Sequence, residues 1–338
     1  MATLTHPAFR ILVGEYGGCD LYFSEMISAE AFLGGTPFEY AYRDARPDPQ
    51  RLVYQLVGRS AEAIIEAARR LAEEPVHGID VNMGCSAPQI AKRGAGVTWM
   101  QHREAAARLI ERLRAVAPGK TVSAKFRLGS GEDSDELVEF ACALEAAGAS
   151  FLTLHPRFRR QTYSRPSHWT YVARLREALS IPLYGSGDIS DAASVRARVE
   201  ESGVEGVMIG RAAAQKPWIF AGIRAELAGV ADGGTPGGDN TPEAPATTVC
   251  GPGVADGAVD LAAVAERFHE LLETMLPEAF LLTRSRRFYA YFLKNLAFGH
   301  RLAAQVQHLE SYEEIKGRVA SYFAEHPEHR HRGEHVHA

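Results

Sequence analysis

The sequence predicts an α/β fold of the (β/α)8 TIM-barrel class, with its first strand missing and a small helical domain after it. Short apolar, β-branched runs alternate with helix-like segments, which is typical of parallel βαβ units. Polar residues follow the end of nearly every run, and a change to Gly-rich and Pro-rich composition at Gly229 precedes a last set of helical patterns. Barrel enzymes carry their catalytic groups at the carboxyl ends of the strands, so these polar residues favour a barrel over an open doubly wound sheet.

The elements can be assigned in chain order. Residues 9–15 are helix-like and precede any strand. Seven strands are expected at residues 19–24, 52–57, 78–83, 121–128, 150–155, 181–186 and 203–209. Helices are expected between them at residues 61–74, 102–116 and 135–147, which are rich in good helix formers. A closed barrel of this class needs eight strands, so the missing one belongs at the front of the chain.

Composition narrows the class of protein. The chain of 338 residues is 46% hydrophobic and 23% charged, which fits one large α/β domain with a smaller appendage. A net charge of -5 disfavours indiscriminate binding to nucleic acid but allows a basic groove. No signal-peptide pattern and no membrane-length apolar run is present, so we expect a cytoplasmic protein without membrane contact. The four cysteines lack paired spacing, which argues against a zinc cage or a disulfide framework.

The expected domains follow from these changes along the chain. A catalytic barrel is expected over residues 1–228, a flexible Gly/Pro-rich linker over 229–258, a helical domain over 259–325 and a His-rich tail over 326–338. Ser311 and Glu314 form a capping box before the last helix. The tail could bind a metal, but we favour a disordered polar end and predict no metal site.

The most distinctive segment is DVNMGCSAPQIAKRGAG, which places Cys85 directly after a predicted strand. Loops at this end of barrel strands carry the chemistry, so a functional thiol is favoured over inert filler. The thiol could act as a nucleophile or as an acid. An unperturbed pKa of about 8.5 keeps a thiol mostly protonated at neutral pH, which suits proton donation, whereas a Cys-His hydrolase would need a base beside it.

Two further kinds of segment suggest an anionic ligand. SAKFRLG ends a strand with Lys125 and Arg127, whose side chains point to the same face and could stabilise negative charge. LYGSGDI and GVMIGRAA close the last two strands with glycines, where barrels commonly bind phosphate. No G-x-G-x-x-G follows an early strand, so a mononucleotide fits better than a dinucleotide.

Eight motifs follow one another along the chain: THPAFR, CDLYFSEM, YQLVG, DVNMGCSAP, KFRLG, LHPRFRRQTYS, YGSGDI and MIGRAAAQKPW. Together they resemble the tRNA-dihydrouridine synthase family. The resemblance spans the barrel, and the C-terminal helices resemble the family's second domain more loosely. It implies an oxidoreductase in which FMN, reduced by NADPH, saturates the C5–C6 bond of uridine in tRNA.

The resemblance also implies site residues. Cys85 matches the catalytic acid that protonates C5 of the uracil ring. The positions that hold the flavin ring are Gln55, Lys125 and His155. Those of the phosphate site are Ser186, Gly187, Asp188, Gly210 and Arg211.

Basic residues near aromatic ones predict the contacts with tRNA. One cluster brackets Tyr163 after a predicted strand, and another lies on an aromatic-rich helix of the C-terminal domain. The residues expected to contact the substrate are Asn82, Arg127, Arg157, Arg284 and Arg287. tRNA and NADPH are the expected partners, and no protein partner is predicted.

Two other functions stay open. One is a flavin-dependent reductase or dehydrogenase of a free small molecule, and the other is a catalytically inactive relative that binds RNA. The missing first strand also predicts that this chain binds FMN weakly and that the gene product begins upstream.

Overall fold

The protein divides into two compact units. A computed structural model describes residues 3–129, 131, 134–231, 251–252, 254–255 and 258–333. Within these ranges the first unit comprises residues 21–189 and 193–210, and the second comprises residues 3–20, 190–192 and everything described after 210. The expected boundary was at residue 228. The second unit instead begins at residue 211 and also includes the N-terminal residues 3–20.

The first unit is built on a parallel sheet of seven strands, hydrogen-bonded in chain order, with α-helices between them. The strands are β1 (Tyr22–Ser28), β2 (Leu52–Val57), β3 (Gly78–Met83), β4 (Thr121–Arg127), β5 (Phe151–His155), β6 (Leu183–Gly185) and β7 (Gly206–Val207). Every residue of β2 and β3 is buried, as expected for parallel strands that are covered on both faces. The predicted α/β class of the TIM-barrel type is therefore confirmed, with seven strands in the part of the chain that the structure describes.

One strand lies later in the chain than predicted. The first was expected at residues 19–24, but β1 runs from Tyr22 to Ser28 and is irregular between Phe23 and Met26. Glu25 interrupts the apolar run, so the sequence pattern ends before the strand does. All seven strands begin within three residues of their predicted starts, so the main difference is the later end of β1.

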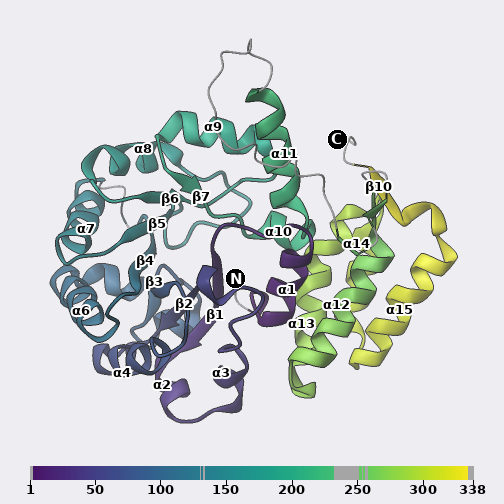
Figure 1. Cartoon of the computed structure of the whole chain (residues 1–338), viewed down its shortest axis with the longest axis horizontal. Helices are drawn as coiled ribbons and strands as arrows, with labels where there is room; N and C mark the ends of the chain where they lie inside the picture. Colours follow the sequence, from purple (N-terminus) through teal and green to yellow (C-terminus); the bar gives the residue numbers. More distant parts are fainter. Residues whose placement is uncertain are drawn as a thin grey trace. The chain divides into compact units, whose positions relative to one another are not determined.

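Helices cover the outer side of the curved sheet (Figure 1). The elements between the strands are α2 (Ala29–Leu33), α3 (Pro37–Ala41), η1 (Pro49–Arg51), α4 (Ala61–Leu71), α5 (Pro88–Ala91), η2 (Gly96–Gln101), α6 (Arg103–Val116), α7 (Ser134–Ala146), α8 (Trp169–Ala178) and α9 (Ala192–Ser202). The strongly amphipathic α4 shows why they form: Ser60 caps its first turn, and Ile64, Ala68 and Leu71 are buried on one face. The three helices predicted from composition are confirmed.

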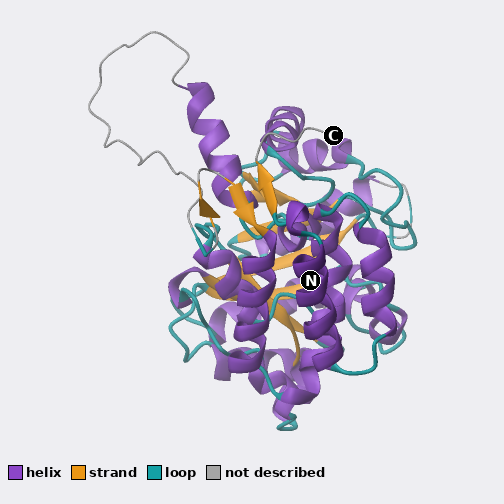
Figure 2. Ribbon diagram, turned by 90° about the vertical axis from the view of Figure 1, so that its right-hand side faces the viewer, coloured by secondary structure: helices purple, strands orange, loops and turns teal. Residues whose placement is uncertain are grey.

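The second unit is mainly helical; Figure 2 distinguishes helices, in purple, from strands, in orange. Its helices are α1 (Pro7–Glu15), α10 (Arg211–Gln215), α11 (Ile219–Ala231), α12 (Leu261–Met275), α13 (Glu278–Phe292), η3 (Leu293–Asn295), α14 (Gly299–His308) and α15 (Tyr312–Glu325). The predicted capping box is present, with Ser311 and Glu314 satisfying each other's backbone N–H groups at the start of α15. None of the described helices combines the length and apolar character needed to cross a bilayer.

Helix α1 is an integral part of this second unit. It packs against α12, with Leu12 fully buried and the Phe9 ring 6.4 Å from that of Phe288. Glu15 pairs with Arg267 of α12 at 2.6 Å. The helix predicted at residues 9–15 is confirmed, but its apolar face completes the helical core.

Short elements of secondary structure lie at the edges of the expected linker and tail. Helix α11 extends to Ala231, and the short strands β8 (Val254–Ala255) and β9 (Ala258–Asp260) precede α12, while residues 232–250 lie outside the described residues. The tail contains η4 (Pro327–His329) and β10 (His331–Gly333), which pairs antiparallel with β9. These two elements lie within the tail that was expected to be disordered, and residues 334–338 are not among those described.

Candidate functional site

The register of the sheet gathers polar side chains from four neighbouring strands. Residues paired across parallel strands have side chains on the same face, so each pair lies side by side. The pairs are Gln55 with Asp80, Asp80 with Ser123, Asn82 with Lys125, and Arg127 with His155. The structure thus brings together the candidates predicted on β2, β3, β4 and β5.

Asp80 is fully buried and anchors this group. Its two carboxylate oxygens accept hydrogen bonds from Gln55 Nε2 and Ser123 Oγ, each at 2.7 Å. Burial raises the pKa of Asp80 to about 6, although the two hydrogen bonds and the charge of Lys125 act in the opposite direction. Sequence analysis missed the role of Asp80; an acidic residue within an otherwise buried strand is the signal that could have found it.

Asn82 connects this group to the loop that carries Cys85. Its amide Nδ2 donates to Gln55 Oε1 at 2.9 Å, and its Oδ1 accepts from the backbone N–H groups of Gly84 and Cys85 at 3.1 and 2.8 Å. Asn82, which was expected to contact the substrate, therefore has a side chain that orients the cysteine loop.

Gly96 closes the same loop from the other side. The Val97 N–H donates to the Cys85 carbonyl at 3.0 Å. Gly96 has φ of +59°, and a Cβ there would lie 2.5 Å from that carbonyl oxygen. Only glycine allows this approach, which keeps the half-buried thiol of Cys85 at the end of β3.

Lys125 lies on β4 next to Asn82 in the register. Burial lowers its pKa to about 8, partly offset by the charge of Asp80. Its ammonium group makes no hydrogen bond to any described residue. A half-buried cation without an acceptor is costly, and a bound electron-rich group would supply the missing partner.

Tyr163 covers the histidine at the end of β5. Its ring, which is 57% exposed, stacks on His155 with 5.9 Å between centroids and 19° between planes. Its hydroxyl accepts a hydrogen bond from Arg127 Nη2 at 3.2 Å. Arg127 is buried and also donates to the Phe158 carbonyl, so it holds the β5–α8 loop in place.

The position of Arg157 does not support its expected contact with tRNA. Its side chain is 1% exposed, and its guanidinium donates to both carboxylate oxygens of Asp188, at 2.6 and 2.7 Å, and to the Arg165 carbonyl. Hydrogen bonds from Arg157 and Ser167, with the charge of Arg157, outweigh burial and lower the pKa of Asp188 to about 2. Arg157 is therefore inaccessible to RNA phosphate, because Asp188, distant in sequence, occupies it.

The glycine loop after β6 is built around α8. A Cβ at Gly185 would lie 2.2 Å from the Trp169 ring, so only glycine fits there. Ser186 Oγ donates to the Met208 carbonyl at 3.0 Å, and Gly187 contributes its carbonyl to the Trp169 indole N–H at 3.1 Å. Gly210 ends the first unit, and Arg211 begins α10 of the second.

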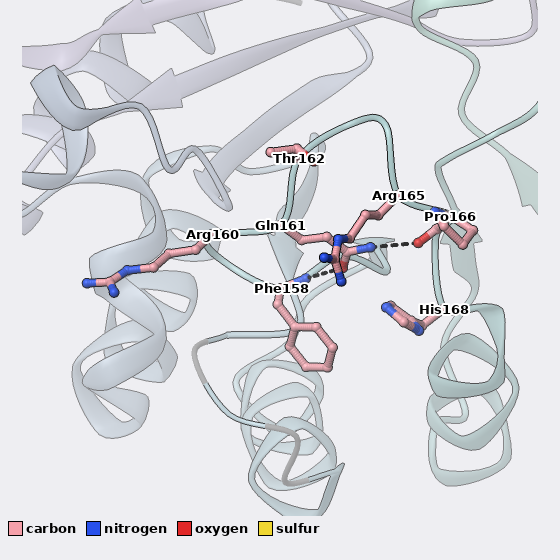
Figure 3. A pocket seen from close by; sticks show the side chains of 7 residues that line it. All are labelled: Phe158, Arg160, Gln161, Thr162, Arg165, Pro166 and His168. Atoms are coloured by element: carbon pink, nitrogen blue, oxygen red, sulfur yellow. Dashed lines mark hydrogen bonds between the residues drawn. The ribbon is translucent and has the colours of Figure 1, made fainter.

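The β5–α8 loop also forms a pocket of about 620 Å³ (Figure 3). Gln161 links two parts of the loop, because its side chain accepts from the Phe158 N–H and donates to the Pro166 carbonyl. Arg160 and Arg165 are exposed and have no acidic partner among the described residues. The lining residues are Phe158, Arg160, Gln161, Thr162, Arg165, Pro166 and His168.

In the second unit, the exposure of the basic residues decides which of them are candidates for RNA contact. Arg284 is buried, with its guanidinium 4.4 Å from the Phe280 ring centroid, so the expected contact with RNA is not supported by its position. Arg287 is half-buried and lies over Tyr291, together with the exposed Lys294. Arg301 on α14 lies over Phe298, which is 62% exposed; sequence analysis did not single out this pair.

Fold and site together define a parallel α/β protein of the barrel type with a cysteine, a lysine and a histidine at the carboxyl ends of neighbouring strands. Comparison with known proteins agrees with this class. Residues 1–233 match the family model described as "Dihydrouridine synthase (Dus)". The chain therefore belongs to the dihydrouridine synthase family.

Individual relatives are moderately similar. Proteins from Rhodobacter capsulatus and Aquifex aeolicus, both named "Probable tRNA-dihydrouridine synthase", are 38% and 34% identical over 241 and 224 residues. These alignments cover 70% and 65% of this chain and 73% and 69% of the relatives. Among solved structures, FabK from Thermotoga maritima has a TM-score of 0.40 at 18% identity, over 64% of this chain and 58% of that one.

Proposed function

We propose that the protein is a tRNA-dihydrouridine synthase that uses FMN and NADPH to reduce the C5–C6 double bond of uridine. The observation that carries the proposal is the half-buried ammonium of Lys125, without an acceptor, beside the Cys85 loop at the carboxyl edge of the sheet. The family to which the chain belongs and the names of its relatives support the same reaction.

The groups around Lys125 fit the ring of a flavin. Gln55 uses one amide hydrogen on Asp80 and one lone pair for Asn82, which leaves one donor and one acceptor. The ammonium and the amide suit the carbonyl and nitrogen positions along the polar edge of the ring, whereas His155 Nε2 already lies 2.9 Å from Arg157 Nη1. Gln55, Lys125 and His155 would hold it. When bound, the reduced flavin supplies the hydride for C6.

The phosphate end fits less directly. The Asp188 carboxylate is neutralised by Arg157, and the Ser186 hydroxyl donates to a backbone carbonyl. We infer that a phosphate here would depend on backbone N–H groups near Gly187 and Gly210, rather than on the Ser186 and Asp188 side chains.

Cys85 would supply the proton to C5. The loop anchored by Asn82 and closed over Gly96 holds the thiol at a fixed place relative to Lys125. A donor that is positioned before the substrate arrives lowers the entropic cost of proton transfer. Asn82 acts on the thiol through the loop, because its Oδ1 already accepts two backbone N–H groups and its Nδ2 donates to Gln55 Oε1 and Met26 Sδ.

Two surfaces would bind the RNA. In the first unit, exposed Tyr163 offers a stacking face, and Arg160 and Arg165 offer cations for a neighbouring phosphate. In the second unit, Arg287, Lys294 and Arg301 have no acidic partner among the described residues and lie over aromatic rings. Both combine charge with stacking, as single-stranded and loop RNA requires.

The test is to incubate the FMN-loaded protein and NADPH with an unmodified tRNA transcript, with a short uridine-containing oligoribonucleotide and with free uridine. Dihydrouridine is then measured by mass spectrometry of the digested products. We expect efficient product formation with tRNA and little with free uridine, because free uridine has no phosphates for the proposed cationic contacts.

The same experiment separates the alternatives. Equal reduction of free uridine and tRNA would identify a small-molecule reductase. Tight tRNA binding without flavin retention or product would identify an inactive RNA-binding relative. Either result overturns the proposal.

A further inference from the structure

The end of helix α15 carries a cluster of metal-ligating side chains that the proposed reaction does not use. His326 follows α15, and Glu328 and His329 lie in the 3-10 helix η4. Glu328 Oε1 is 3.2 Å from His326 Nδ1 and 3.8 Å from His329 Nε2, and the three ligand atoms lie within 4.8 Å of one another. Among the described residues, these three side chains form a group whose ligand atoms are close enough to share one ion.

The short sequence His-Pro-Glu-His explains why these groups converge. His326 is the N-cap of η4 and His329 is its last residue, so one tight turn brings the two histidines together. Their rings stack with centroids 5.3 Å apart. Pro327 fixes the first backbone angle of the turn, and the His329 N–H donates to the His326 carbonyl at 3.0 Å.

The spacing suits a small tetrahedral ion. Zinc bound about 2.1 Å from each ligand atom keeps neighbouring ligand atoms roughly 3.4 Å apart. The two distances from Glu328 Oε1, 3.2 and 3.8 Å, lie on either side of this value. Two imidazoles and one carboxylate are a ligand set that binds zinc in proteins and leaves a fourth position for water.

Tyr322 supplies the support that a ligating histidine needs. Its hydroxyl is 2.8 Å from His329 Nδ1, the nitrogen that faces away from Glu328. A histidine that binds metal through one ring nitrogen donates its other N–H to an oxygen, which fixes the ring. The Tyr322 ring also packs against both imidazoles, with centroids 4.8 and 5.8 Å away.

We propose that His326, Glu328 and His329 form a zinc-binding site that fastens the C-terminal segment to the end of α15. The segment continues through Arg330, which pairs with Asp260 at the start of α12 at 2.7 Å, and then into β10. Bound zinc would join α15 through η4 to β10 and stabilise this corner of the helical unit. This inference does not depend on the proposed reaction.

The experiment uses the full chain and zinc ion in competition with a chromophoric chelator. We expect one zinc equivalent per chain, and at least a tenfold loss of affinity in each of His326→Ala, Glu328→Gln and His329→Ala. Zinc should also raise the melting temperature of the wild type but not of Glu328→Gln. His300→Ala and His308→Ala are the matched controls, because both histidines are exposed on α14, and they should keep wild-type affinity.

Two results would overturn the site. One is zinc affinity in all three single variants within twofold of the wild type. The other is loss of zinc binding in a His331→Ala, His335→Ala, His337→Ala triple variant while the three single variants keep it, which would move the ion to the end of the tail. All substituted positions are at the surface or beyond the described residues, and near-wild-type circular dichroism checks that each variant folds.

Discussion

At the scale of single residues, Lys125 should set the response of the site to pH. Its pKa is lowered to about 8 by burial, so its ammonium charge disappears as pH rises through that value. FMN affinity of the wild type, measured by flavin fluorescence quenching, should therefore weaken above pH 8. Lys125→Arg keeps its charge and should bind FMN with little change over pH 7 to 9. An unchanged decline in Lys125→Arg would contradict this role.

Asp188 makes a second prediction at this scale, about stability. Its pKa is about 2 in the folded protein and near 3.9 in an unfolded chain, so its pair with Arg157 stabilises the fold above about pH 4. This stabilisation is lost as pH falls toward 2. Asp188→Asn should lower the free energy of unfolding at pH 7, and the difference from the wild type should vanish near pH 2, as urea titrations can measure.

The control for that prediction is Asp135→Asn, which breaks an exposed pair with Arg174. Exposed pairs contribute about 0–1 kcal/mol, so this variant should change stability little at any pH. An Asp188→Asn variant that behaves like the control would show that the buried guanidinium does not need its partner.

At the scale of elements, α1 is held by the helices of the second unit. Leu12 is fully buried there, and Leu→Ala substitutions at such sites cost about 2–5 kcal/mol. Leu12→Ala should lower stability by that amount, whereas Ile11→Ala, at the neighbouring half-buried position, should cost less. Equal small effects in thermal or urea unfolding would mean that α1 is not part of this core.

Some parts of the fold and of the candidate site could be predicted from the sequence, and others could not. The order of strands and helices, the Cys85 loop and the lysine of β4 follow from local patterns, because apolar runs and helix formers are read directly from the chain. The packing of α1 could not be predicted, since its partners on α12 lie more than 240 residues later. Arg157 was misjudged for the same reason, because Asp188 neutralises it across 31 residues.

The C-terminal tail shows what composition leaves out. Its polar composition indicated disorder, yet pairing of β10 with β9 and the Arg330–Asp260 ion pair order residues 331–333. Composition indicates how little apolar surface a segment can bury. It does not indicate whether a strand elsewhere in the chain, here β9, is available for pairing.

At the scale of the whole molecule, binding of tRNA should depend on cations that have no acidic partner. The variant Arg287→Gln, Lys294→Gln, Arg301→Gln removes three charges, and each phosphate contact contributes roughly 0.7–0.9 to the slope of log affinity against log salt. If all three contact phosphate, the slope should shrink by roughly 2 to 3, and affinity at low salt should fall.

The matched control removes three cations that are already paired: Arg112→Gln, Arg174→Gln and Lys316→Gln. It changes net charge by the same amount, so a purely global effect of charge would weaken both variants equally. Filter binding across a salt series distinguishes the two. Identical slopes for the two triple variants would show that the cations of α13 and α14 make no contact with tRNA phosphates.

In the proposed reaction, Cys85 gives a proton to uridine in tRNA at the carboxyl edge of the sheet. The most direct test measures dihydrouridine by mass spectrometry after reaction of FMN-loaded wild type, Cys85→Ala and Cys142→Ala with tRNA and NADPH. Cys142 is the matched control, a half-buried thiol on α7 directed to the Ala178 carbonyl. We predict that Cys85→Ala forms almost no dihydrouridine while NADPH still reduces its flavin, and that Cys142→Ala matches the wild type. A wild-type yield of dihydrouridine from Cys85→Ala would contradict the claim.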